Sequence, residues 1–122
     1  RAFSAGWTSR VLQSATAWLL REPHSFDMVA KARAIYQQRR DGLADALNCR
    51  GVPVSAGSGL CLWLPVASEG FATVTLAARN IAINPGRKFS LLPGDYIRVA
   101  TSMLGEDKWD SVADAIALAS TV

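Results

Sequence analysis

The hydrophobic and polar positions predict helices at both ends of the chain and strands between them. From about Trp7 to Arg21 the apolar residues recur at helical spacing and form one stripe, which consists of Trp7, Val11, Ala15, Trp18 and Leu19. Pro23 ends this helix, because a proline disfavours helical geometry in the residue before it. Ser25 or Asp27 is then placed to cap a second helix.

The second helix is predicted to reach about Leu47. Its apolar stripe consists of Val29, Ala32, Tyr36, Leu43 and Leu47. Gly42 interrupts this helix at a cost of about 1 kcal/mol relative to alanine. Gly51 follows it, and glycine readily adopts the left-handed conformation that ends many helices.

Turn residues separate the remaining elements, which are shorter. They are an extended run at 52–55, a strand at 60–64 ended by Pro65, a helix from Ser68 or Glu69 to Arg79 closed by a left-handed Asn80, strands at 81–84 and 96–101, and a helix at 106–119. The order ααββαββα, with short connections and no internal repeat, predicts the α+β class. We expect a two-layer sandwich in which a small antiparallel or mixed sheet carries helices on one face.

Domain organisation follows from the same pattern. We expect one domain over residues 1–122, in which residues 1–24 form a leading helix and connector and residues 25–122 form the main body. The chain begins with Arg1 rather than Met and enters a helical pattern at once, so we interpret it as the C-terminal fragment of a longer protein.

Composition narrows the class of protein. Half of the 122 residues are hydrophobic and 19% are charged, which excludes a disordered tail. No apolar run approaches the roughly 20 residues of a membrane helix. The net charge of +3 is uneven, since residues 1–50 hold eight basic and four acidic side chains. No basic stripe with interleaved aromatic residues, as in a nucleic-acid site, is present, so we interpret this charge as mostly a solvated helix face. Cys49 and Cys61 are predicted to be free thiols in a reducing cytoplasm.

The sequence contains no convincing catalytic set and no metal-site spacing. Its single histidine, His24, falls in the predicted connector between two helices, where a solvated imidazole is the ordinary outcome. Cys61 alternates with leucines in an apolar strand and is expected to act as a small hydrophobic residue. Asp110 and Asp114 lie four apart on a predicted helix face, which is typical of a solvated surface.

Arg98 is the most informative side chain. Alternation in strand 96–101 places Ile97, Val99 and Thr101 on one face, and Tyr96 and Arg98 on the other. An arginine inside an otherwise uncharged strand needs a partner or access to water. Its guanidinium either reaches solvent over an aliphatic stem or binds a carboxylate through its planar fork.

Four segments follow one another in an order and spacing that are typical of a known family: Tyr36–Leu43, Gly59–Pro65, Ile81–Phe89 and Ile97–Val99. Together they resemble the C-terminal small domain of fold-type I pyridoxal-phosphate aminotransferases. The closest resemblance is to the aminotransferase-like domain of MocR-type regulators, a branch of the GntR transcription factors. It extends from about Trp7 to the end of the chain.

The resemblance implies roles for particular residues. Arg98 corresponds to the arginine that binds the substrate α-carboxylate, and Gly59 to a glycine close to the substrate. The family's Pro-Gly-x-x-Phe turn, which borders the mouth of the active site, is matched by Pro85, Gly86 and Phe89. Arg39 and Arg40 match a helix arginine pair, which we interpret as helix surface or an ion pair. The chain departs from the pattern at Met28, often His in MocR proteins, and at Ser58, commonly a second glycine in aminotransferases.

In this family the lysine that binds pyridoxal phosphate lies in the large domain. Lys31, Lys88 and Lys108 match none of the family's cofactor residues, so we expect the cofactor in the full-length parent and not on this chain. No residue here is assigned a catalytic role, and the fragment alone is not expected to be an enzyme.

Three functions remain open from the sequence. The chain is either the effector- or cofactor-sensing domain of a MocR-type regulator, in which a missing N-terminal domain binds DNA, or the small domain of a true class I/II aminotransferase. A third possibility is a free-standing α+β interaction module. The basic first half and the segment Tyr36–Leu43 favour the regulator. In either family the parent is expected to be a cytoplasmic homodimer that binds a small amino or carboxylate ligand, with no attachment to membranes.

Overall fold

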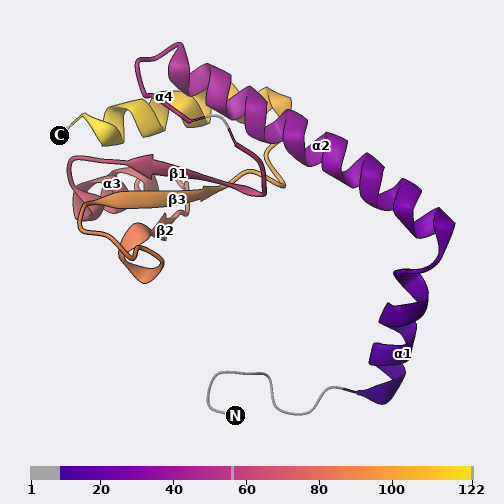
Figure 1. The fold of residues 1–122 in the computed structure, drawn as a ribbon. Coiled ribbons are helices and arrows are strands. Elements are labelled where there is room, and N and C mark those ends of the chain that lie inside the picture. The colour runs from indigo at the N-terminus through magenta and orange to yellow at the C-terminus, as the bar shows by residue number, and fades with distance from the viewer. Residues whose placement is uncertain (1–8, 56, 122) are drawn as a thin grey trace. The chain divides into compact units, whose positions relative to one another are not determined.

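The structure is a computed structural model that describes residues 9–55 and 57–121 (Figure 1). The chain divides into two compact units, residues 1–34 and residues 35–122. Within the described residues its helices and strands are α1 (Arg10–Leu19), α2 (Pro23–Asn48), β1 (Cys61–Pro65), α3 (Glu69–Ala77), β2 (Asn84–Pro85), β3 (Tyr96–Ala100) and α4 (Trp109–Ser120), with the short 3₁₀ helices η1 (Gly86–Lys88) and η2 (Glu106–Lys108).

The first unit contains α1 and the start of α2. The predicted helix at 7–21 is confirmed over the residues of α1, whereas Trp7 of its stripe lies outside the described residues. No residue of α1 is buried, and the Trp18 side chain is 61% exposed. The Ser9 side chain caps this helix by accepting a hydrogen bond from the backbone N–H of Leu12.

The beginning of α2 corrects two sequence-based predictions. The helix starts at Pro23, so Ser25 and Asp27 lie inside its first turns and do not cap it. Proline is tolerated there because the first N–H groups of a helix have no intrahelical acceptor. His24 therefore lies in the first turn of a helix, where it is exposed, and not in a connector.

The second unit contains a three-stranded antiparallel sheet of order β1-β3-β2, which confirms the predicted α+β fold (Figure 1). In the central pairing, Leu62 lies opposite Val99 and Leu64 opposite Ile97. All four side chains are buried. They form the core with residues of α2, α3 and α4, including Leu43, Leu47, Ala72, Leu76, Ala113 and Ile116.

Two predicted extended runs differ in the structure. Residues 52–55 form no strand, because the N–H of Val52 donates to the carbonyl of Leu47 at 3.0 Å and that of Val54 to the Asn48 side chain at 3.0 Å. The end of α2 thus uses the hydrogen-bonding groups that a sheet would need. The predicted strand at 81–84 shortens to Asn84–Pro85, since the N–H of Ile81 donates to Leu76 at the end of α3.

Local helix signals were predicted more accurately. Ser68 caps α3, its side chain accepting a hydrogen bond from the N–H of Phe71 at 3.2 Å. Asn80 adopts a left-handed φ of 60°, and Gly51 a φ of 77°, as predicted for residues that close helices.

Gly42 in α2 marks a close contact with α4. A Cβ atom at this position would lie 2.4 Å from the ring of Trp109, which is closer than any real contact. The indole of Trp109 is fixed in turn by its Nε1–H, which donates to the carbonyl of Leu104 at 3.3 Å. The glycine is therefore required by tertiary packing, although it weakens the helix locally.

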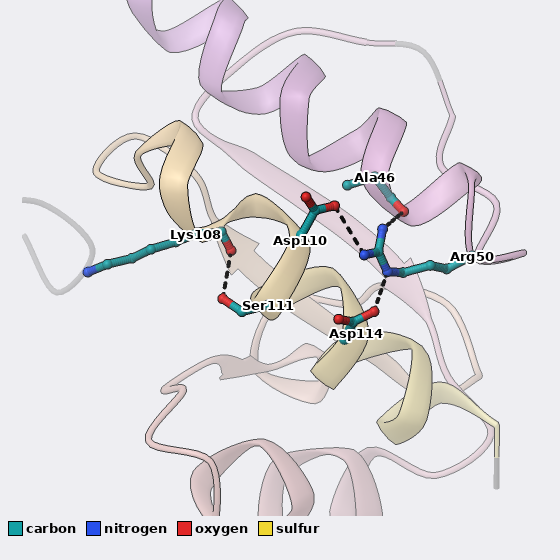
Figure 2. Close-up of polar contacts among 6 residues, drawn as sticks. All are labelled: Ala46, Arg50, Lys108, Asp110, Ser111 and Asp114. Atoms are coloured by element: carbon teal, nitrogen blue, oxygen red, sulfur yellow. Dashed lines mark hydrogen bonds and ion pairs between the residues drawn. The ribbon is translucent and has the colours of Figure 1, made fainter.

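Arg50 joins the end of α2 to α4 through polar contacts (Figure 2). Its Nε donates to Asp114 at 2.5 Å, its Nη2 to Asp110 at 3.1 Å and its Nη1 to the carbonyl of Ala46 at 2.9 Å. Asp110 and Asp114 are exposed, as predicted, but they form ion pairs. The hydrogen bond with Asp114 raises the pKa of Arg50 above its ordinary value. Because the pKa is raised, the ion pairs of Arg50 stabilise the fold at every pH below the ordinary pKa of arginine. This stabilisation is lost only as the pH rises through the raised pKa of Arg50, so Arg50 stays charged near neutral pH.

None of the helices in the described part of the chain is both long enough and apolar enough to cross a membrane.

Candidate functional site

Arg98 lies at the centre of β3, on the side of the sheet that faces away from the core. Its neighbours Ile97 and Val99 are buried while Arg98 is partly exposed, so the predicted alternation is confirmed. Trp63 of β1 and Asn84 of β2 lie directly opposite Arg98 on the two flanking strands. Directly opposite residues point to the same side of a sheet. We call the surface formed by Trp63, Asn84, Tyr96 and Arg98 the Arg98 face.

The guanidinium group of Arg98 lies over the ring of Phe89, 4.7 Å from its centroid. It forms no hydrogen bond or ion pair with any residue that the structure describes. A cation over an aromatic face is held by the ring's electrons, and that contact uses none of the N–H donors. The planar fork of Arg98 is therefore positioned and still available to bind an anion.

The turn that carries Phe89 is held by contacts from both sides. A Cβ atom on Gly86 would lie 2.4 Å from the carbonyl oxygen of Tyr96, so only glycine allows the turn to approach β3 this closely. On the other side, the buried carboxylate of Glu69 accepts a hydrogen bond from the backbone N–H of Arg87 at 2.8 Å. These contacts place the Phe89 ring beneath Arg98.

A cavity of about 260 Å³ lies beside Arg98 on the same face of the sheet. Its wall includes the stacked rings of Trp63 and Tyr96, whose centroids are 5.1 Å apart. The remaining lining comes from the segment Phe89–Leu92, which follows η1. Phe89 therefore belongs both to the cavity and to the contact with Arg98.

Gly59, the second predicted site residue, is not brought next to Arg98. Its φ of 109° requires glycine, but a Cβ atom there would meet no atom within 4 Å. The register pairs Arg98 with Trp63, four residues further along the chain, which corresponds to about 13 Å of extended strand. Gly59 lies just before β1, near the end of the β1–β3 pair at which the N–H of Thr101 donates to the carbonyl of Leu60 at 2.9 Å.

Arg39 and Arg40 hold that end of the sheet. Nη1 of Arg39 donates to the carbonyl of Ser102, and Nη1 of Arg40 donates to the carbonyl of Gly57 at 3.0 Å. Arg40 is only 7% exposed, so the interpretation as helix surface is wrong for this residue. Neither arginine forms an ion pair within residues 9–55 and 57–121, because both side chains bind the backbone of loops next to the sheet.

The three lysines of the chain lie on its surface. Lys31, Lys88 and Lys108 are all exposed, and none lines the cavity. Cys49 and Cys61 are free thiols, and no three His, Cys, Asp or Glu residues in the described segments are grouped as metal ligands would be.

Comparison of the sequence with known protein families shows to which family the chain belongs. The sequence model for aminotransferases of class I and II matches residues 1–116. The chain belongs to this family. This match confirms the resemblance seen in the four sequence segments. The α+β fold described above is therefore the fold of a family member.

Curated relatives of this family member include both a regulator and enzymes. The vitamin B6 salvage pathway transcriptional repressor PtsJ of Salmonella typhimurium is 29% identical over 109 residues, which cover 88% of this chain and 25% of the repressor. An LL-diaminopimelate aminotransferase of Dehalococcoides mccartyi is 32% identical over 94 residues, which cover 73% of this chain and 24% of the enzyme. The chain thus spans about a quarter of the length of these relatives.

Solved structures share the fold. The aromatic aminotransferase from Pyrococcus horikoshii superimposes with a TM-score of 0.70 at 21% identity, covering 87% of this chain and 30% of the enzyme. An aminotransferase from Mycobacterium tuberculosis gives a TM-score of 0.65 at 20% identity, over 80% of this chain and 27% of that protein. At these identities the likeness concerns the fold alone.

Sequence reasoning missed the cavity next to Arg98. Part of the lining could have been predicted from strand alternation. Trp63 lies between two leucines that are buried, so its side chain must face away from the core. Alternation also placed Tyr96 on the same face as Arg98. Leu91 and Leu92 carried no such signal, since they belong to an irregular segment that has no periodicity.

Proposed function

We propose that this chain is the C-terminal, ligand-binding domain of a pyridoxal-phosphate-dependent transcriptional regulator of the MocR type. In this proposal Arg98 binds the carboxylate of an amino-acid effector. A DNA-binding domain and the cofactor's covalent site lie in other parts of the full-length parent, which is a cytoplasmic homodimer. The chain by itself is not an enzyme.

The observation that carries the proposal is the state of Arg98. Its guanidinium is held over Phe89, faces away from the core and has no polar partner among the described residues. A carboxylate matches the spacing of the guanidinium donors and binds them in pairs. Hydrogen bonds of this charged kind contribute about 1.5–3 kcal/mol, roughly twice as much as neutral ones.

The regulator is favoured over an enzyme by the extent of similarity. The match with the PtsJ repressor covers 88% of this chain, against 73% for the LL-diaminopimelate aminotransferase. The enzyme remains the second candidate, because its identity is higher, at 32% against 29%. In that case the chain is the small domain of an aminotransferase and Arg98 binds the carboxylate of its substrate.

One observation separates the two candidates. The coding sequence upstream of Arg1 is expected to encode a winged helix ahead of the cofactor-binding domain. A cofactor-binding domain that follows the start codon directly would instead favour the aminotransferase. The Arg98 contact is common to both, so it is tested separately.

The test of Arg98 is calorimetric titration of the full-length protein with an amino acid. Arg98→Lys keeps the aliphatic stem and the positive charge but removes the planar fork, so affinity should fall about tenfold or more. The melting temperature should stay unchanged, because no buried ion pair is lost. Arg79→Lys is the matched control, since Arg79 is exposed in the turn after α3 and its side chain bonds only to the carbonyl of Thr75 in that helix. Unchanged affinity with a lowered melting temperature in Arg98→Lys would make Arg98 a structural residue.

A further inference from the structure

We infer that the cavity beside Arg98 receives the side chain of the ligand, and that this ligand is an aromatic or large aliphatic amino acid. The inference rests on the proposed contact between Arg98 and a carboxylate. It adds the class of ligand, which neither the family nor its relatives determine.

The cavity and the guanidinium share two residues. The Phe89 ring carries the guanidinium at 4.7 Å and also lines the cavity. Trp63 is the direct cross-strand partner of Arg98 and also lines the cavity. A ligand whose carboxylate is bound by Arg98 therefore has the cavity as its immediate neighbour.

The lining selects against charged side chains. It consists of Trp63, Phe89, Ser90, Leu91, Leu92 and Tyr96, none of which is charged. The hydroxyl of Ser90 is already engaged, since it donates to the carbonyl of Leu92 at 2.7 Å and accepts from the N–H of Leu92 at 3.3 Å. A carboxylate or ammonium group placed here would find no charged partner in the lining.

The cavity is slightly smaller than the usual site of a whole drug-sized ligand. Its 260 Å³ lies just below the range of about 300–1,000 Å³ that is usual for whole drug-sized ligands. The apolar surface around it is open to a ligand, as Leu91 is 98% exposed and Leu92 is 73% exposed. Covering this surface with an apolar side chain is favourable because it removes apolar area from water.

The experiment measures dissociation constants of the full-length protein for L-phenylalanine, L-alanine and L-aspartate by calorimetry. All three carry the α-carboxylate, so they differ only in the group that enters the cavity. We expect L-phenylalanine to bind at least roughly tenfold more tightly than the other two. Equal binding of the three, or tighter binding of L-aspartate, would overturn the inference.

Variants of the lining locate the effect. Leu92→Asp introduces a charge into the wall and should weaken L-phenylalanine about tenfold while changing L-alanine less than about twofold. Leu91→Asp should also weaken the binding of L-phenylalanine. Because Leu91 is 98% exposed, this substitution should not affect folding. Val74→Asp is the matched control, because Val74 is 70% exposed on α3 and does not line the cavity. It should leave both dissociation constants unchanged.

Two other outcomes separate this inference from the proposed function. If Leu92→Asp lowers the melting temperature and weakens all three amino acids equally, the cavity is a packing surface for another part of the polypeptide and the inference is wrong. If Arg98→Lys changes no affinity while Leu92→Asp still weakens only L-phenylalanine, the apolar pocket stands and the carboxylate contact of the proposed function is refuted.

Discussion

At the scale of single residues, Arg40 shows how a charged side chain of α2 supports the sheet. It is buried, its Nη1 donates to the carbonyl of Gly57, and its Nε has no hydrogen-bond partner among the described residues. The gain from one charged hydrogen bond is therefore partly offset by the cost of burying an N–H without an acceptor. Arg40 positions the loop before β1 and does not touch the Arg98 face.

Arg40→Met keeps the apolar stem and removes the hydrogen bond to Gly57. We expect the free energy of unfolding to fall by about 1–2 kcal/mol, measured by urea denaturation followed by circular dichroism. Arg33→Met, an exposed position on the same helix, should change it by less than about 0.5 kcal/mol. A variant Arg40→Met as stable as the wild type would show that the desolvation cost cancels the hydrogen bond completely.

At the scale of elements, the contact between α2 and α4 combines close packing with ion pairs. The Trp109 ring lies against the backbone at Gly42. Arg50, which follows the C-terminal end of α2, binds two aspartates of α4 (Figure 2). The ion pairs are formed by largely exposed carboxylates and contribute little, as is usual for surface pairs. The packing at Gly42 should therefore dominate this contact.

Gly42→Ala tests that conclusion, because helix propensity and packing predict opposite results. Alanine favours a helix over glycine by about 1 kcal/mol, but its Cβ would overlap the Trp109 ring, and overpacking of this kind costs about 1–3 kcal/mol. We expect a net loss of stability in urea denaturation.

Gly70→Ala is the matched control for this substitution. Gly70 is also helical, in α3, and a Cβ atom there would meet nothing within 4 Å, so the variant should gain up to about 1 kcal/mol. Trp109→Leu combined with Gly42→Ala should recover part of the loss. Stabilisation by Gly42→Ala alone would contradict the packing argument.

At the scale of the whole molecule, the chain corresponds to one part of a longer family member. It spans about a quarter of its curated relatives and offers an arginine, an aromatic ring and an apolar cavity on one face of a sheet. Its lysines Lys31, Lys88 and Lys108 are exposed, and none of them lines that cavity. Ligand recognition and covalent cofactor binding are therefore expected to reside in different parts of the full-length protein.

If covalent cofactor binding resides in another part of the full-length protein, the isolated chain of 122 residues should not bind pyridoxal phosphate covalently. After incubation with pyridoxal phosphate and reduction by borohydride, mass spectrometry should detect no stoichiometric adduct at Lys31, Lys88 or Lys108. All three lysines are exposed, and none lines the cavity on the Arg98 face. The full-length protein, treated identically, should carry one adduct on a lysine outside this chain, and a stoichiometric adduct on any of the three would refute the assignment.

The sequence by itself determined the features that depend on neighbours within a few positions. Alternation in strand 96–101 placed Ile97 and Val99 in the core and Arg98 on the opposite face. The cap at Ser68 and the left-handed Asn80 followed from the chemistry of single residues. Such signals are local, because backbone geometry and the i, i+2 and i, i+4 periodicities act over one or two turns or a single strand. The ordered set of four segments also identified the family.

Only the tertiary structure decided which groups meet across long stretches of chain. The run at 52–55 resembles a strand in sequence, yet its N–H groups bond to the end of α2. Arg40 resembles a surface arginine, yet the Gly57 loop covers it. The cavity joins Trp63, Tyr96 and the segment Phe89–Leu92, which are separated by up to 33 positions. Their proximity is set by the register of β1 against β3 and by the close approach of Gly86 to Tyr96, which are non-local contacts that no sequence periodicity encodes.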